Sequence, residues 1–188
     1  RFKFENVSLK ISDDLDKAES KLLEIRKKRD QPHTDKKIIT SWNCLAGIGL
    51  IHAYRYIGDK KYLDMAENLF ECLIKLHYSA SLVHSSIDGV NEKEEFLEDY
   101  ASVLLFVTYL HEETYKYEKY LKEFSSEIMK FKKKTWIESN NEDFVEVEAE
   151  AYDHPVPSSI SMAELAITRS NILLKKEYVV DEGFKQPL

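Results

Sequence analysis

Apolar residues recur at spacings of three and four positions through most of the chain, and this pattern predicts six helices. The expected ranges are residues 12–29, 41–57, 60–77, 95–115, 117–133 and 160–174. Helices that begin near positions 41, 96 and 158 carry few charges on any side, which is typical of inner helices. The helices over 60–77 and 117–133 carry an apolar stripe opposite a charged face, which is typical of outer helices. The sequence therefore predicts a mainly α protein with a repeat of roughly 55–60 residues.

Two stretches alternate between apolar and polar positions instead of following the helical period. Residues 2–11 alternate loosely and predict a short extended arm. In residues 144–151, valines and alanines alternate with glutamates, which predicts a half-exposed strand paired with Trp136-Ile137. Asp88-Gly89 predicts a turn between two helical pairs. Short β-hairpins are thus expected in the loops that connect the helices.

Helical pairs of this kind cannot bury their apolar faces alone, so they stack into α-solenoids or close into α/α toroids. In a toroid, the loops that lead into the inner helices gather at one end. Polar residues are concentrated on these loops, at positions 33–43, 84–99 and 152–159. We therefore expect a functional site where the three loops meet.

Length and charge narrow the class of protein. With 188 residues, of which 43% are hydrophobic, the chain is expected to form a single soluble domain over residues 1–188. The net charge of -7 argues against non-specific binding of nucleic acid. The basic run Lys130 to Lys134 is instead expected to be the solvated last turn of a helix.

Targeting signals and cysteines bear on the cellular compartment. No apolar run has the length of a membrane span and no signal peptide is recognised, so we expect a cytoplasmic protein without a membrane partner. Cys44 and Cys72 fall within apolar helical patterns and are expected to be reduced core residues. Because the chain begins with Arg1 rather than Met, we expect it to be part of a longer protein.

Three motifs follow one another in an order and spacing that resemble a known family, the thioredoxin-domain-containing, spermatogenesis-associated proteins. They are Pro32-His33-x-Asp35-x-Lys37 followed by Thr40-Ser41-Trp42-Asn43-x-Leu45, then Phe96-Leu97-Glu98-Asp99-Tyr100-Ala101, and finally Tyr152-Asp153-x-x-x-Pro157-Ser158. The chain departs from the family pattern where Lys36 replaces an acid, Cys44 replaces Gly and Ser159-Ile160 replaces Gly-Asn. The resemblance nevertheless covers nearly the whole chain.

In that family a thioredoxin-like domain precedes a six-hairpin α/α toroid, similar to those of N-acylglucosamine 2-epimerases and six-hairpin glycosidases. The resemblance implies that this chain is the C-terminal part of the toroid, about half of the ring. It also implies that the thioredoxin-like domain lies outside these 188 residues. No redox activity is therefore assigned to the chain.

Candidate catalytic residues are those that would serve sugar chemistry, which needs paired carboxylates or a histidine with a carboxylate. Glu98 and Asp99 are consecutive acids at the start of an apolar helix, and either one with Asp153 is a candidate acid/base pair. His33 is a candidate for an epimerase-like proton shuttle. The alternative is structural, because the helix dipole favours acids in a first turn and one acid can pair with Lys37.

Candidate substrate-binding residues are Asp35, Lys37, Trp42, Asn43 and Tyr100. Asp35 is expected to orient a substrate hydroxyl, Trp42 to stack on a sugar ring and Asn43 to face the ligand. In the alternative interpretation, the loop containing Asp35 and Lys37 is a brace between repeats and Trp42 belongs to the core.

No metal or cofactor is expected from the sequence. The histidines at 52, 84, 111 and 154 lack the spacing of metal ligands, and glycine-rich phosphate loops and nucleophile elbows are absent.

Two functions remain open at this point. The first is a carbohydrate-binding pocket with epimerase- or glycosidase-like chemistry, and the second is a non-catalytic interaction scaffold for a thioredoxin-like domain. Half a ring would expose apolar surface of the inner helices, so the chain is expected to self-associate or to require the rest of its parent protein.

Overall fold

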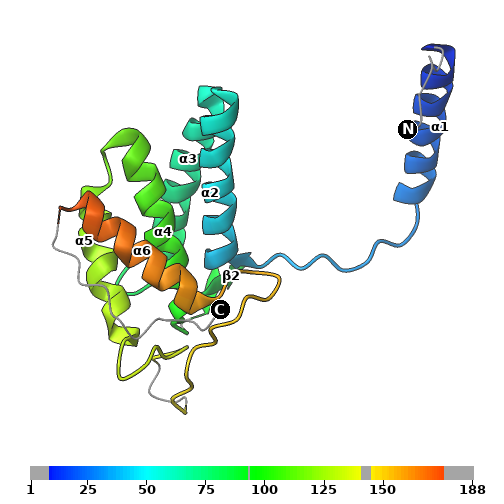
Figure 1. Ribbon diagram of the computed structural model, residues 1–188. Helices are drawn as coiled ribbons and strands as arrows, with labels where there is room; N and C mark the ends of the chain where they lie inside the picture. The colour runs from blue at the N-terminus through cyan, green and yellow to red at the C-terminus, as the bar shows by residue number, and fades with distance from the viewer. Residues whose placement is uncertain (1–8, 93, 141–144, 176–188) are drawn as a thin grey trace. The chain divides into compact units, whose positions relative to one another are not determined.

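A computed structural model describes residues 9–92, 94–140 and 145–175. The chain divides into two compact units, Arg1–Asp35 and Lys36–Leu188. The described part is mainly helical, as the sequence predicted (Figure 1), and it also contains one small three-stranded sheet that the sequence did not predict. The expectation of a single domain cut from a larger toroid stays a prediction.

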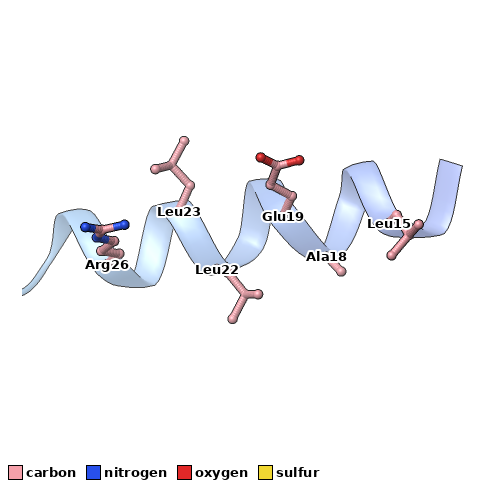
Figure 2. A pocket seen from close by; sticks show the side chains of 6 residues that line it. All are labelled: Leu15, Ala18, Glu19, Leu22, Leu23 and Arg26. Carbon is pink, nitrogen blue, oxygen red and sulfur yellow. The ribbon is translucent and has the colours of Figure 1, made fainter. Parts of the chain in front are cut away.

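The first unit contains helix α1, Leu9–Lys27. The extended arm expected over residues 2–11 is wrong for residues 9–11, which are helical, and residues 2–8 lie outside the described part. The apolar side chains of α1 are exposed and follow a single helix, so they form a surface rather than an enclosed cavity (Figure 2). The most exposed of them are Leu15, Leu22, Leu23 and Ile25.

The second unit begins with a helical hairpin. Helix α2, Thr40–Ile57, ends at Gly58, whose φ of 78° is the left-handed conformation that glycine adopts without strain. Helix α3, Lys60–His77, starts after Asp59, whose side chain accepts a hydrogen bond from the Lys61 backbone N–H. These bounds confirm the predicted helices and the predicted break between them.

The sheet joins the start of this hairpin to the segment that follows it. Strands β1 (Ile38–Ile39), β2 (Ser85–Ile87) and β3 (Val90–Glu92) are antiparallel and lie in the order β1-β2-β3. The predicted turn at Asp88-Gly89 connects β2 to β3, with both residues at positive φ. The sheet therefore holds the loop before β2 beside the first turn of α2.

Helix α4, Leu97–Thr114, is the centre of the second unit. It packs against α2, against α5 (Glu118–Glu127) and against α6 (Ser159–Leu173), which crosses it (Figure 1). Buried residues occupy every side of α4, which confirms the prediction of an inner helix. The predicted helix over 117–133 is shorter, because α5 passes into the 3-10 turn η1, Ile128–Phe131.

The segment between η1 and α6 contains the predicted pairing in reduced form. Ile137 and Glu148 make an isolated antiparallel bridge, flanked by a hydrogen bond from Ala149 N to Trp136 O of 2.9 Å. The interpretation of the basic run in front of it as a solvated last helical turn is correct only in part: Lys130 lies in η1 and Lys133 and Lys134 are exposed, but two of its side chains are half-buried in ion pairs. Lys130 pairs with Glu95, and Lys132 Nζ lies 3.1 Å from Glu164 Oε1.

Two further expectations about burial have different outcomes. Cys44 is fully buried on α2, as predicted, whereas Cys72 is exposed on α3, so its assignment to the core is wrong. The face of α3 that packs inward runs through Leu63, Ala66, Phe70 and Leu73, and position 72 lies outside it. Among the described helices, none is long and apolar enough to span a membrane.

Candidate functional site

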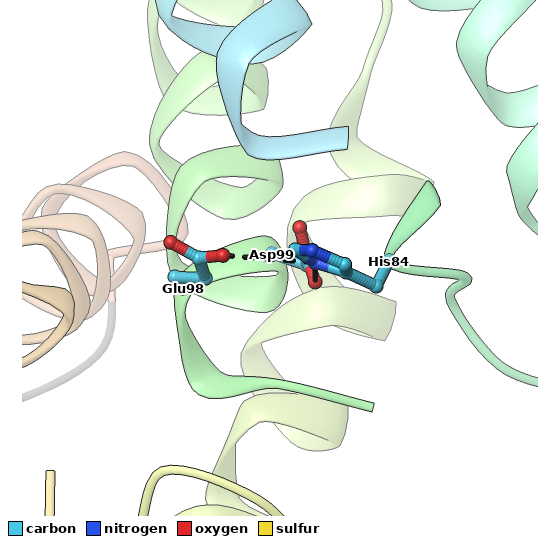
Figure 3. A group of neighbouring side chains, drawn as sticks. All are labelled: His84, Glu98 and Asp99. Atoms are coloured by element: carbon cyan, nitrogen blue, oxygen red, sulfur yellow. Dashed lines mark hydrogen bonds and ion pairs between the residues drawn. The ribbon is translucent and has the colours of Figure 1, made fainter. Parts of the chain in front are cut away.

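The starts of α2 and α4 meet at a buried histidine–aspartate pair. Asp99, in the first turn of α4, is 1% exposed, and its Oδ2 lies 2.8 Å from His84 Nδ1 (Figure 3). Its Oδ1 accepts a hydrogen bond of 3.2 Å from the Ser41 backbone N–H in the first turn of α2. One carboxylate thus engages the N-termini of two helices, where the helix dipoles favour negative charge.

The environment of this pair shifts both titrating groups. Burial raises the pKa of the Asp99 carboxyl to about 6. The hydrogen bond to Asp99 raises the pKa of His84 above its ordinary value. Because the Asp99 carboxylate accepts a hydrogen bond from Nδ1, the neutral His84 ring carries its proton on that nitrogen. His84 and Asp99 therefore titrate as a coupled pair.

A second histidine supports the loop behind the pair. His77, the last residue of α3, is fully buried, with Nδ1 2.7 Å from Thr40 Oγ1 and Nε2 2.8 Å from Ser86 Oγ. Thr40 also donates its backbone N–H to the carbonyl oxygen of His84 at 2.9 Å. Burial lowers the pKa of His77, so its ring is neutral at physiological pH. This network fixes the backbone on which His84 stands.

Beside the pair lies a small acidic cleft. Its volume is about 180 Å³, and three carboxylates from different segments line it, those of Glu98, Glu138 and Glu150. Residues 152, 154 and 156–159 of the segment that leads into α6 complete the lining. The cleft therefore lies where the chain enters both α4 and α6.

Glu138 is positioned by both of these helices. Its carbonyl oxygen accepts a hydrogen bond of 2.9 Å from Leu97 N, at the start of α4. Its side-chain Oε2 accepts one of 3.3 Å from the Ser159 hydroxyl, at the start of α6. Burial, with a smaller effect from the charge of Glu98, raises the pKa of Glu138 above its ordinary value.

Of the residues proposed from the sequence, Glu98 lines the cleft and Asp99 lies behind it. Asp153 does not line the cleft, because its Oδ1 accepts a 2.8 Å hydrogen bond from Ser158 N and braces the start of α6. Tyr100 is fully buried, and its hydroxyl accepts hydrogen bonds from Leu82 N and Lys130 Nζ. That position argues against contact between Tyr100 and a ligand.

The other proposed residues lie in the first turn of α2 and in the segment that precedes it. Asn43 donates its side-chain N–H to the Ile39 carbonyl at 2.8 Å, and Trp42 is 60% exposed, so the alternative that placed Trp42 in the core is wrong. Lys37 is exposed at the beginning of the second unit. His33 and Asp35 are exposed in the first unit, and their part in a site stays a prediction.

His84, Glu138 and Glu150 are among the residues of this region that sequence reasoning missed. His84 was set aside because no other histidine or cysteine follows it at ligand spacing, although its partner is an acid 15 positions later. Glu138 and Glu150 fell in the predicted hairpin, where an alternating pattern suggested only a solvated face. The available signal was the polar cluster over residues 84–99, which begins at His84 and ends at Asp99.

No family model matches the chain. Over 180 residues the chain is 32% identical to "Uncharacterized protein B0495.5" of Caenorhabditis elegans, in a region that covers 87% of this chain. The same region is 24% of the worm protein, so the chain spans about a quarter of the length of the curated relative it matches.

Proposed function

We propose that this chain is part of an α/α toroid whose polar end binds a carbohydrate in the cleft of Glu98, Glu138 and Glu150. The proposal extends the resemblance to the thioredoxin-domain-containing, spermatogenesis-associated family and, through its fold, to N-acylglucosamine 2-epimerases. It describes a part of a larger protein, in which further segments would complete the ring.

The observation that carries this proposal is the convergence of carboxylates at the entrances to two central helices. Glu98 lies in the first turn of α4, and Ser158 and Ser159 lie at the start of α6. Glu138 accepts hydrogen bonds from the starts of both helices. A volume of about 180 Å³ corresponds to about six water molecules at about 30 Å³ each, which suits one small polyol. Carboxylates and hydroxyls are the groups that bind sugar hydroxyls.

The proposed chemistry divides the acid and base roles between carboxylates in different surroundings. Glu138 acts as the general acid, because burial favours its protonated form. Glu98 supplies the second carboxylate, with Oε1 3.6 Å from His84 Nδ1. Asp99 is a positioning residue, since it orients His84 and lies behind the cleft.

A thermal-shift titration with neutral monosaccharides tests the cleft. A ligand that binds only the folded chain raises its stability by about 2.7 kcal/mol at 100 times its Kd. We expect at least one sugar to raise the melting temperature of the wild type, and Glu138→Gln to remove that shift. Glu146→Gln, in an exposed side chain of the same connecting segment, is the matched control. A panel of sugars without any shift would contradict the proposal.

The second candidate is an interaction scaffold for a thioredoxin-like domain. Its support is that Asp99, Asp153 and Asn43 all hydrogen-bond to backbone atoms, as braces do. In addition, Trp42 and Tyr56 are exposed on one side of α2, which a partner or a second copy would cover. Sedimentation of the wild type beside Trp42→Ser tests this candidate, and a monomer in both cases, with no binding to a thioredoxin-like domain, would contradict it.

A further inference from the structure

We propose that His84, Glu98 and Asp99 bind a divalent transition-metal ion such as Zn²⁺. The three side chains come from the loop before β2 and from the first turn of α4, and they converge on one point (Figure 3). One potential ligand atom from each lies within 4.8 Å of the other two. This inference goes beyond sugar binding and does not depend on it.

Two of the three distances between these atoms are close to those around a bound zinc ion, and the third is at most 4.8 Å. His84 Nδ1 lies 2.8 Å from Asp99 Oδ2 and 3.6 Å from Glu98 Oε1. Tetrahedral bonds of about 2.0–2.2 Å separate neighbouring ligand atoms by about 3.4 Å. The shorter distance has to widen by roughly half an ångström, and the longer one already fits within a few tenths. Binding also requires His84 Nδ1 to release the proton that it donates to Asp99 in the metal-free chain, because only the deprotonated nitrogen can bind the ion.

The chemistry of the ligand set selects the class of metal. One imidazole nitrogen with two carboxylate oxygens suits zinc and neighbouring first-row metals better than Mg²⁺ or Ca²⁺, which prefer oxygen ligands alone. Three protein ligands leave a fourth position for water, as in catalytic zinc sites. A divalent cation would also offset the two carboxylates that approach His84.

Two of the three ligands, Asp99 and His84, are held in place before any ion arrives. Asp99 uses its other oxygen to accept the Ser41 backbone N–H, an outer contact of the kind that orients metal ligands. The His84 ring packs edge-on against Phe96, with centroids 4.9 Å apart, and its carbonyl is bonded to Thr40. Little ordering entropy of these two side chains therefore opposes binding.

The cluster also has an entry path. The side chains of His84 and Glu98 are 23% and 28% exposed, whereas Asp99 is buried beneath them. Figure 3 shows Glu98 with one carboxylate oxygen turned toward His84 and the other turned away from it. An ion can therefore enter from solvent between His84 and Glu98 without unfolding the core.

Calorimetry on the chelator-treated chain without a histidine tag tests the proposal, with Zn²⁺, Mn²⁺ and Mg²⁺ as separate probes. We expect one Zn²⁺ per chain, bound more tightly than Mg²⁺. Glu98→Gln removes a ligand charge at nearly the same shape and should weaken Zn²⁺ binding at least tenfold, since losing even an outer contact costs about 10–100-fold. Glu71→Gln, exposed on α3, makes the same charge change and should leave the affinity unaltered.

Absorption spectra of the Co²⁺-loaded chain identify the nitrogen ligand. We expect visible bands in the wild type that are lost in His84→Gln, while circular dichroism confirms that the variant is folded. Equal Zn²⁺ affinity in wild type and Glu98→Gln, or no Zn²⁺ binding by the wild type, would overturn the proposal. His84 and Asp99 would then form only a structural hydrogen bond. The sugar titration keeps its own readout, because it compares the wild type with Glu138→Gln, and Glu138 is not a proposed metal ligand.

Discussion

Helices α2 and α4 look alike in the sequence and differ in the folded chain. Both contain long apolar stretches with few charges, and both were predicted to be inner helices. Helix α4 is buried on every side, whereas α2 buries one side through Cys44, Gly47 and Ile51. On its opposite side Trp42 is 60% and Tyr56 87% exposed.

The difference shows what apolar composition can and cannot determine. An apolar composition allows a helix to be buried on all sides, but the neighbouring elements decide whether it is buried. Helix α4 has α2, α5 and α6 around it, whereas α2 packs mainly against α3 and α4. The uncovered side of α2 is therefore the natural place for a further segment, a partner or a second copy.

The buried positions of the two helices also differ in chemistry. The first buried residues of α2 are Thr40 and Ser41, which are fixed by hydrogen bonds to the loop before β2 and to Asp99. The buried positions of α4 are mostly apolar beyond its first turn. Packing thus stabilises α4, and a polar network, which depends on protonation, stabilises the start of α2.

The largest effect is expected from Phe106→Ala. This side chain of α4 is fully buried, and its loss should lower the free energy of unfolding by about 3–5 kcal/mol. Trp42→Ala removes an even larger side chain from the exposed side of α2 and should change that free energy by about 0.5 kcal/mol or less. Urea unfolding measures both free-energy changes. Similar losses for the two variants would show that Trp42 is also covered in the folded chain.

A pair of glycines on α2 gives the next largest effect. A Cβ at Gly47 would meet the Phe106 ring at 2.2 Å, whereas one at Gly49 would meet nothing within 4 Å. Gly47→Ala should therefore destabilise the chain by about 1–3 kcal/mol through overpacking. Gly49→Ala should stabilise it by up to about 1 kcal/mol through helix propensity.

Thermal or urea unfolding of the two glycine variants separates these two effects, because the same methyl group is added on nearly opposite sides of α2. Adding Phe106→Leu to Gly47→Ala should recover part of the loss, because it removes the ring that the methyl group meets. A stabilising Gly47→Ala would mean that α2 and α4 do not approach each other as closely as described.

The smallest effect concerns His77, which fixes Thr40 at the start of α2. Burial lowers its pKa below the ordinary 6.5, so the unfolded chain binds a proton more readily than the folded chain. Its contribution to stability is complete above pH 6.5 and is lost as the pH falls through the lowered value. Replacement of His77 by Gln should lower stability at neutral pH and flatten this acid dependence.

The difference between wild type and His77→Gln reports on this histidine. His84 is present in both proteins, and its raised pKa acts in the opposite direction; because its charge also contributes to lowering the pKa of His77, the difference reports His77 together with this repulsion. Urea unfolding between about pH 7 and about pH 5 covers the relevant range. An equal pH dependence of both proteins would contradict a neutral, buried His77.

The sequence by itself determined the elements whose signals are local. The bounds of α3, the break at Gly58-Asp59 and the turn at Asp88-Gly89 follow from apolar period, capping and left-handed backbone, which involve only near neighbours in the chain. The same local signals located the acids at the start of α4.

Only the tertiary structure decided which of these residues meet. The tertiary structure determines which side of α2 is buried, places His84 against Asp99 and brings Glu138 to the starts of α4 and α6. These contacts join segments far apart in the chain, and many faces of similar polarity compete for each of them. Packing geometry settles that competition, and no single stretch of sequence contains it.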